Sequence, residues 1–545
     1  MYDNSDLLQS IDYAGGYSVQ DEFKILLISK DNLLYNAKIQ INSGKGKVEI
    51  SENDNVFHNY TICFRDIISF TYKEISQQES EQYKMKHKTK NQQRFNLLLF
   101  TIIFYPNIQY KQLVYNFPRF KIVNKHTRKR KQISFFEKGN KLHEILVDFN
   151  LQYEQTNMGD LSDIKHFNQY LFNSSFGSAS KLFPNQSTEK RMYIIINPVS
   201  GCGKAEEIFL KTKVFYESAE IKYDVLISKN KEQIINTIDT LNTQQYNGIV
   251  IYGGDGTVHN VINAMFNRID YHDVISTIAI GVVPCGKSNS FANTILHESS
   301  EENQLDSYAY IISKGITKKC DVQEIEGLYP NNQLIYSISN ITWGISSKIS
   351  SEGVLKSSDI NTNDLNKQAV LSYLPLAANI ESIPNIKLPI HKNKGFIHIK
   401  DKLCLFFAAN VPITRNNYHS HPKAKMNNTF TDIVLMKENE YTKKKLLNVV
   451  NEQMKQGSYI NKLSETVDKD SGVEYIQTSF WRLTPLDVDR NTEDGFQGDL
   501  NLTNLNDSVD GLYVDGEKYP LETIQVRVPN NKKIKVFCLP SLEQL

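Results

Sequence analysis

Residues 248–266 read GIVIYGGDGTVHNVINAMF, and this stretch decides the fold of the region around it. Its first five residues form an apolar run typical of a buried strand, and residues 258–266 have helical character. Between them come Gly253, Gly254, Asp255, Gly256 and Thr257. Glycines allow a tight turn that other residues resist, and a helix N-terminus presents free N–H groups and positive potential. The stretch predicts a phosphate cradle with one carboxylate inside it.

Two further turns follow apolar runs in the same way. Residues 197–204 (NPVSGCGK) follow the run 192–196, and residues 284–292 (PCGKSNSFA) follow the run 278–283. The first turn is not a Walker A loop, because Pro198 replaces its first glycine and Ala205 its Ser/Thr. Alternating strands and helices predict an open parallel sheet. The three turns should meet at its carboxyl edge, where such sheets bind ligands.

Composition limits the classes of protein to which the chain can belong. Its 545 residues are enough for several domains, and 62 Lys+Arg against 61 Asp+Glu give a net charge of +1, which argues against a nucleic-acid binder. The most apolar stretch, 96–105, is half of the ~20 residues that a membrane-spanning helix needs, so it predicts a buried strand. No signal peptide is visible at the start. Six dispersed cysteines predict reduced thiols in a cytoplasmic protein.

The pattern changes along the chain suggest five segments. Residues 1–19 are expected to be a flexible tail and residues 156–189 a linker. Residues 20–155 are rich in short strands, residues 190–325 alternate strand and helix, and residues 326–545 are again strand-rich. The expected fold class is therefore an α/β nucleotide-binding domain plus a β-rich domain, preceded by a small β-barrel. The C-terminal end of the last segment could return to the α/β domain.

Six runs in residues 20–155 have strand character. They are KILLI (24–28), NLLYNAKIQI (32–41), YTICF (60–64), IISFTY (67–72), FNLLLFTIIFY (95–105) and KQISFF (131–136). A helical stretch over 138–151 follows them, which suggests a pleckstrin-homology-like barrel. Basic clusters at 84–90 and 125–131 have two interpretations: solvated loops, or attraction to anionic lipid at ~1 kcal/mol per basic residue.

The quoted motifs, in this order, resemble the diacylglycerol-kinase catalytic domain shared by sphingosine, ceramide and bacterial lipid kinases. The resemblance continues through SISNITWGISSKIS (337–350), the segment 431–460, VEYIQTSFWRLTPL (473–486) and GLYVDGEKYPLETIQVRVPNNKKIKVF (511–537). It covers roughly residues 190–540. The strand-rich segment before it resembles the module that precedes this domain in ceramide kinases and some sphingosine kinases.

The resemblance implies a kinase with ATP and Mg²⁺ in a cleft, and it implies roles for single residues. Asp255 falls on the proposed general base. Asp515, in the VDGE motif, is associated with magnesium, directly or through water. The residues implied at the ATP phosphates are Asn197, Ser200, Gly201, Lys204, Gly253, Gly254, Gly256, Thr257, Gly286, Asn289 and Glu517.

The sequence departs from the family at several positions. Asn260 stands where many members have a glutamate in the helix. Ser350, with Glu352 close behind, stands where sphingosine kinases place an aspartate for the lipid head group. Lys356 and Lys367 are the basic residues nearest to the family's arginines, and lysine lacks the arginine fork.

The sequence therefore predicts an ATP-dependent kinase of a sphingoid-base hydroxyl, with a lipid substrate, an anionic membrane surface as partner of the N-terminal module, and no nucleic acid. It is expected to be cytoplasmic and peripherally membrane-associated. Ceramide or diacylglycerol is the alternative acceptor. A catalytically inactive membrane-binding scaffold is the alternative from another class. NAD kinases share GGDGT, but the β-rich half and the VDGE motif favour a lipid.

Overall fold

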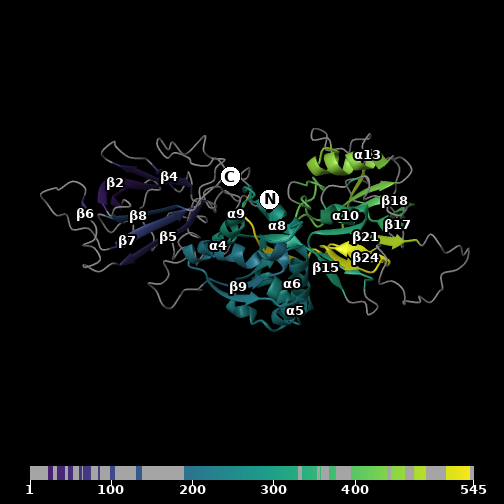
Figure 1. Ribbon diagram of the computed structural model, residues 1–545, viewed down its shortest axis with the longest axis horizontal. Coiled ribbons are helices and arrows are strands. Elements are labelled where there is room, and N and C mark those ends of the chain that lie inside the picture. The colour runs from purple at the N-terminus through teal and green to yellow at the C-terminus, as the bar shows by residue number, and fades with distance from the viewer. Residues whose placement is uncertain are drawn as a thin grey trace, which may run out of the picture.

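The computed structural model describes strands within residues 22–137 and then residues 190–328, 334–352, 356, 367–375, 395–415, 418–437, 443–460, 472–486 and 511–540. The strands pair into three sheets, which follow one another along the long axis of the molecule (Figure 1). In this part of the chain no helix is both long enough and apolar enough to cross a membrane.

The N-terminal sheet has the order β4-β3-β2-β1-β8-β7-β5, and the short strand β6 pairs with β2. Its strands are β1 (Glu22–Ile28), β2 (Leu33–Asn42), β3 (Lys47–Glu52), β4 (Tyr60–Cys63), β5 (Ile67–Glu74), β6 (Lys84–Met85), β7 (Leu98–Phe104) and β8 (Lys131–Glu137). All six predicted strands are confirmed, and β3 and β6 are additions. The apolar stretch 96–105 supplies β7, an inner strand. The helix predicted over 138–151 lies outside the described residues, and the barrel stays a prediction.

The central sheet has the order β10-β9-β11-β12-β25-β13. Its strands are β9 (Arg191–Ile196), β10 (Lys222–Ile227), β11 (Gly248–Gly253), β12 (Ala279–Pro284), β13 (Thr317–Asp321) and β25 (Lys533–Phe537). All pairs are parallel except β13 with β25, so the predicted open parallel sheet is confirmed. All of β11 and nearly all of β12 are buried, which explains why they read as continuous apolar runs.

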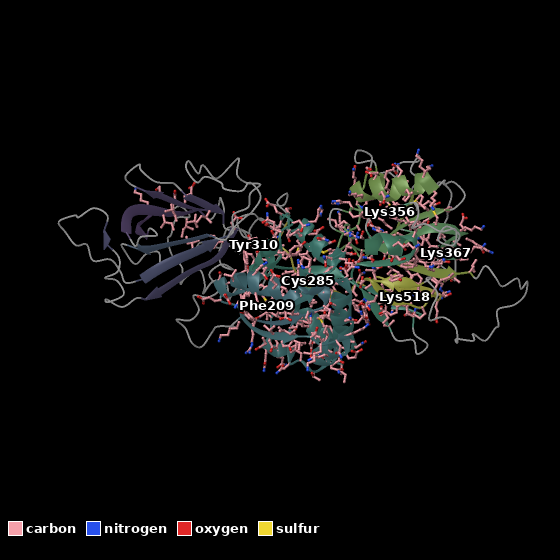
Figure 2. All side chains as sticks on the ribbon, in the orientation of Figure 1. Phe209, Cys285, Tyr310, Lys356, Lys367 and Lys518 are labelled. Atoms are coloured by element: carbon pink, nitrogen blue, oxygen red, sulfur yellow. The ribbon has the colours of Figure 1, made fainter. Side chains whose placement is uncertain are left out.

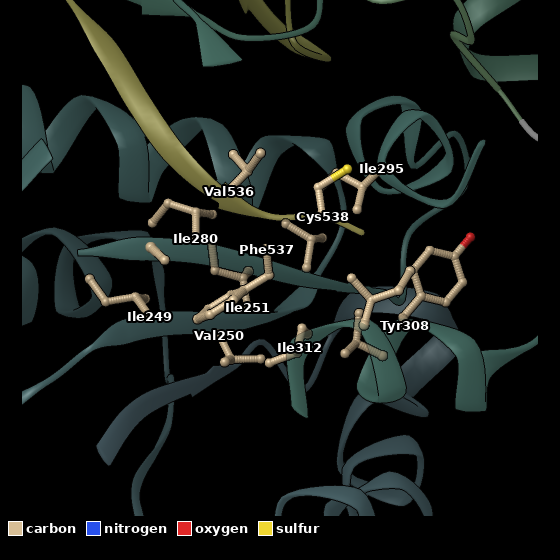
Figure 3. Packing of buried hydrophobic residues seen from close by; sticks show 14 of the residues in the cluster. Ile249, Val250, Ile251, Ile280, Ile295, Tyr308, Ile312, Val536, Phe537 and Cys538 are labelled. Carbon is tan, nitrogen blue, oxygen red and sulfur yellow. The ribbon is translucent and has the colours of Figure 1, made fainter. Parts of the chain in front are cut away.

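Helices connect these strands. They are η5 (Ser200–Gly203), α4 (Ala205–Ser218), α5 (Lys231–Thr240), η6 (Thr243–Gln245), α6 (Asp255–Asn267), α7 (Tyr271–Thr277), α8 (Ser290–Glu298) and α9 (Leu305–Lys314). The C-terminal strand β25 completes the core, where Phe537 lies among residues of β11, β12 and α9 (Figure 3). A Cβ on Gly248 would lie 2.7 Å from the Phe537 ring, so this glycine makes room for it.

The third sheet holds the strands β14 (Gln323–Glu326), β15 (Ile335–Ser337), β16 (Asn340–Gly344), β17 (Lys367–Tyr373), β18 (Ile397–Ala409), β19 (Thr431–Lys437), β20 (Glu474–Thr478), β21 (Phe480–Pro485), β22 (Leu512–Val514), β23 (Glu517–Tyr519) and β24 (Ile524–Arg527). Its described helices are α10 (Ile345–Glu352), α13 (Lys443–Asn448) and the π-helix η9 (Val449–Met454). Two buried clusters form its core, one around Trp481 and one beneath α13 and η9. The predicted β-rich part is therefore present.

Candidate functional site

The glycine turn after β11 is shorter than the sequence suggests, because α6 begins at Asp255 and not at Val258. Gly254 is the N-cap, and its carbonyl accepts the first helical hydrogen bonds, from the N–H groups of Thr257 and Val258. Asp255 is thus the first helical residue, next to amides that have no partner inside the helix. The carboxylate and the positive helix end lie at the same place.

The turn after β12 lies directly against the turn after β11. A Cβ on Gly286 would lie 2.6 Å from the Cα of Gly254, so the two backbones meet at a distance that only glycine allows. Asn289, at a left-handed φ of 53°, shapes this second turn. Its Oδ1 accepts the N–H of Gly286 at 2.8 Å, and its Nδ2 donates to the Gly286 carbonyl at 2.9 Å.

The turn after β9 reaches the same edge through Asn197. Its Nδ2 donates to the Oγ1 of Thr257 at 2.9 Å, and its Oδ1 accepts the N–H of Val199 at 3.3 Å. Ser200 and Gly201 lie in η5, and the exposed Lys204 precedes α4. Strands β9, β11 and β12 are neighbours, so the structure brings the three predicted turns together at one edge of the sheet.

The Asp255 carboxylate is held by the start of helix α8. Its Oδ2 accepts the N–H of Ser290 at 3.1 Å, and its Oδ1 accepts the N–H of Phe291 at 3.5 Å. Burial, and to a smaller extent the nearby Asp515, raises the pKa of this carboxyl to about 6, while the amides of α8 act in the opposite direction. Near neutral pH the group is therefore a carboxylate that can still take up a proton.

Glu517 approaches the start of α6 from the β-rich domain. A Cβ on Gly256 would lie 2.2 Å from the Glu517 Oε1, so this glycine leaves room for the glutamate. The Glu517 Oε2 lies 3.6 Å from the Nζ of Lys231, at the first residue of α5. Lys231 is a cation beside the predicted phosphate edge. Sequence reasoning missed it, because no motif surrounds it.

Asp515 is buried behind this edge, 1% exposed, and accepts donors from the backbone of residues 338–340 and from Ser337. It also faces the Nδ1 of His259 on α6 at 3.1 Å. Direct binding of magnesium would have to displace these donors. The Asp515 carboxylate, with its present hydrogen bonds, is therefore not arranged to coordinate a metal ion. In the described part of the chain no three His, Cys, Asp or Glu residues are grouped to hold a metal. The predicted metal role of Asp515 stays a prediction.

The remaining predicted residues lie outside the three turns. Asn260 is buried in α6. Ser350 and Glu352 lie in the last turn of α10, and nothing is described of their side chains. Lys356 and Lys367 lie in the β-rich part, whereas Cys285 of the third turn lies in the central part (Figure 2).

The chain is similar to known proteins over its central part. Residues 191–325 match the diacylglycerol kinase catalytic domain. Sphingosine kinase 2 of Arabidopsis thaliana is 27% identical over 164 residues, which are 30% of this chain and 33% of that protein. Ceramide kinase of Mus musculus is 29% identical over 170 residues, which are 29% of this chain and 31% of that protein.

One relative matches over a longer stretch. Sphingoid long chain base kinase 4 of Schizosaccharomyces pombe is 21% identical over 368 residues, 62% of this chain and 73% of that protein. The matches with the two relatives above, in contrast, cover only about a third of those proteins, 33% and 31% of their lengths. Residues 191–325 thus match the diacylglycerol kinase catalytic domain, and over 30% and 29% of its length the chain is similar to a sphingosine kinase and a ceramide kinase.

Proposed function

We propose that this protein is an ATP-dependent lipid kinase that phosphorylates the primary hydroxyl of a sphingoid base. The observation that carries the proposal is the Asp255 carboxylate, with a pKa of about 6, at the edge where the three turns meet. Phosphoryl transfer needs positioning and charge neutralisation more than covalent chemistry. Backbone amides, a helix N-terminus and one poised base meet those needs.

The ATP phosphates are proposed to lie against the turns 197–204, 253–257 and 284–289. The close contact of Gly254 with Gly286 supports this, because neither glycine places a side chain between the two turns. Lys231 and Lys204 would add positive charge at the two sides of the site. When bound with ATP, magnesium would neutralise charge on the phosphate oxygens.

Asp255 is proposed to act as general base. It would accept the proton of the lipid hydroxyl as the hydroxyl oxygen forms its bond to the γ-phosphorus and the bond to the leaving ADP oxygen breaks. The amides of Ser290 and Phe291 hold the carboxylate in one orientation. A fixed orientation matters because a misplaced base loses much of its effect.

The acceptor class is proposed from the relatives. Proteins named sphingosine kinase and sphingoid long chain base kinase support a sphingoid base, and a protein named ceramide kinase supports ceramide as the second candidate. The lipid is proposed to enter from the β-rich side, near Ser350 and Glu352 on α10. The N-terminal module is proposed to contact an anionic membrane surface from the cytoplasm.

The test is transfer of the labelled γ-phosphate of ATP, with magnesium, to a panel of sphingosine, dihydrosphingosine, ceramide and diacylglycerol in detergent. A labelled sphingoid base is the expected product, and labelled ceramide or diacylglycerol would change the acceptor but keep the kinase. NAD⁺ as acceptor is the negative control. If no lipid is labelled while ATP still binds, the chain is an inactive scaffold and the proposal is wrong.

A further inference from the structure

Asp515 occupies an unusual place in the chain. It forms the tight turn between β22 and β23 together with Gly516, and both have positive φ, 49° and 87°. An aspartate tolerates this left-handed conformation better than most residues, but glycine or asparagine would satisfy the turn as well. The turn alone therefore does not explain why this residue is an aspartate.

The hydrogen bonds of the Asp515 carboxylate give the explanation. The Asp515 side chain has five donor partners, drawn from the β15–β16 connection and from α6: Ser337 Oγ at 2.8 Å, Ile338 N at 3.2 Å, Ser339 N at 3.0 Å, Asn340 N at 3.0 Å and His259 Nδ1 at 3.1 Å. The Asp515 N–H also donates to the Asn340 carbonyl at 2.8 Å. Three successive amides that converge on one carboxylate form an anion nest, and here the anion is part of the protein.

This arrangement leaves little capacity for a metal. An ionised carboxylate offers about four lone-pair sites, and the protein's own donors already use them. Magnesium demands near-ideal geometry at about 2.0–2.1 Å from its oxygens, which the crowded carboxylate does not offer without losing donors. Removing the carboxylate, in contrast, would leave three buried amides unpaired, which is costly.

The same contacts join the two halves of the predicted site. His259 lies on α6 of the central domain, and its Nε2 is 2.7 Å from the Tyr519 hydroxyl on β23. Nearby on α6, the Asn263 side chain bonds both the N–H and the carbonyl of Tyr336 at 2.9 Å. The β22–β23 hairpin is thereby fixed to α6, and the hairpin carries Glu517 over Gly256.

We propose that Asp515 is a positioning residue, an internal clamp that fixes the β22–β23 hairpin to residues 337–340 and α6, and that it does not bind magnesium directly. The clamp sets the place of Glu517 beside the start of α6. Its importance for catalysis rests on the proposed kinase function, but the clamp itself can be tested without it.

The experiment compares the full chain with Asp515→Asn and Ser337→Ala. Asparagine would turn an NH₂ group toward buried donors, and Ser337→Ala removes one donor but no carboxylate. The first readout is amide hydrogen exchange of residues 337–340 without nucleotide or metal. The second readout is the magnesium concentration that gives half-maximal phosphoryl transfer at a fixed ATP concentration. If the wild type transfers no phosphoryl group, the magnesium concentration that gives half-maximal ATP binding is measured in its place.

The clamp predicts exchange that is about tenfold or more faster in Asp515→Asn and measurably faster in Ser337→Ala. It also predicts a lower maximal rate and an unchanged magnesium half-saturation in both variants. Wild-type exchange in Ser337→Ala, or a raised magnesium half-saturation in Asp515→Asn alone, would overturn the proposal. If Asp515→Asn does not fold, the hydrogen exchange and the magnesium half-saturation of Ser337→Ala alone test the clamp. If the wild type labels no lipid, the kinase proposal fails while the exchange result still judges the clamp.

Discussion

Asp255 is the residue on which the proposed chemistry depends, and its pKa makes that chemistry testable by pH. A general base must be deprotonated, and burial raises the pKa of this carboxyl to about 6. The transfer rate should therefore fall as the pH drops through about 6 and level off above it. A pH profile of kcat/KM for the lipid measures this limb.

The control for this acid limb of the pH profile is another carboxyl with a raised pKa. Asp432 on β19 also has a pKa raised to about 6 by burial, but it bonds Tyr475 and Gln477 in the β-rich sheet. Asp432→Asn should keep the acid limb. Loss of the limb in Asp432→Asn would move the titrating group away from Asp255.

The raised pKa also makes the folded protein less stable at high pH. The folded Asp255 holds its proton more tightly than the unfolded chain, whose value is 3.8. Its contribution to stability is present below about pH 4 and is lost as the pH rises through 6. The change in melting temperature that Asp255→Asn causes, relative to wild type, should therefore be more favourable at pH 8 than at pH 4. If the substitution lowers the melting temperature more at pH 8 than at pH 4, the hydrogen bonds from the ionised carboxylate to α8 outweigh the cost of burying its charge.

The turns are the elements that build the site, and two glycines in them should respond differently to alanine. In Gly286→Ala the new Cβ would meet backbone, the Cα of Gly254 at 2.6 Å, which cannot easily move. Overpacking of this kind costs about 1–3 kcal/mol of stability. Because it would also force the two turns apart, ATP affinity should fall by about tenfold or more. In Gly256→Ala the new Cβ would meet only the Glu517 carboxylate, which can rotate away.

Gly256→Ala should accordingly bind ATP better than Gly286→Ala, and alanine within α6 should also favour the helix. Nucleotide titration of both variants, beside their melting temperatures, gives the comparison. Equal loss in both would mean that the two turns do not contact the phosphates in the way proposed here.

Local pattern explains which elements could be predicted. The three turns follow continuous apolar strands, and parallel neighbours place such turns at one edge, so the sequence predicts that the turns meet. The hydrogen bond of Asn197 with Thr257 is one of the contacts that result. Strand β3, KVEISE, was missed because it has no continuous apolar run: only Val48 and Ile50 are apolar, and they alternate with polar residues. The clamp was missed because Ser337 and Asp515 are 178 residues apart and no short motif joins them.

In the whole molecule, the N-terminal sheet lies beside α4 and α9, and the β-rich part lies on the other side of the central sheet (Figure 1). The buried Lys314 of α9 donates to the Ile67 carbonyl of β5 at 2.5 Å, which joins the N-terminal sheet to the central domain. The N-terminal sheet is thus attached to the central domain, and none of its described residues belongs to the three turns of the proposed phosphate site.

Removing residues 1–189 should therefore weaken membrane binding more than it slows the reaction. The expected result is weaker binding to anionic vesicles and retained turnover of a detergent-solubilised lipid, because each basic residue near the surface contributes about 1 kcal/mol. Vesicle sedimentation measures the first and the labelled-ATP assay the second. Zwitterionic vesicles serve as control. Unchanged binding to anionic vesicles would mean that the basic clusters are solvated loops.

The most direct test of the account is the initial rate of lipid phosphorylation in Asp255→Asn, with ATP affinity measured on the same protein. Asparagine keeps the size and one acceptor oxygen for the α8 amides but cannot take the hydroxyl proton. A general-base role of Asp255 predicts a loss of about 10²–10⁴-fold in rate with near wild-type ATP affinity. A rate above about a tenth of wild type, well outside that range, would contradict the assignment of Asp255 as the base, and so would loss of folding or of ATP binding.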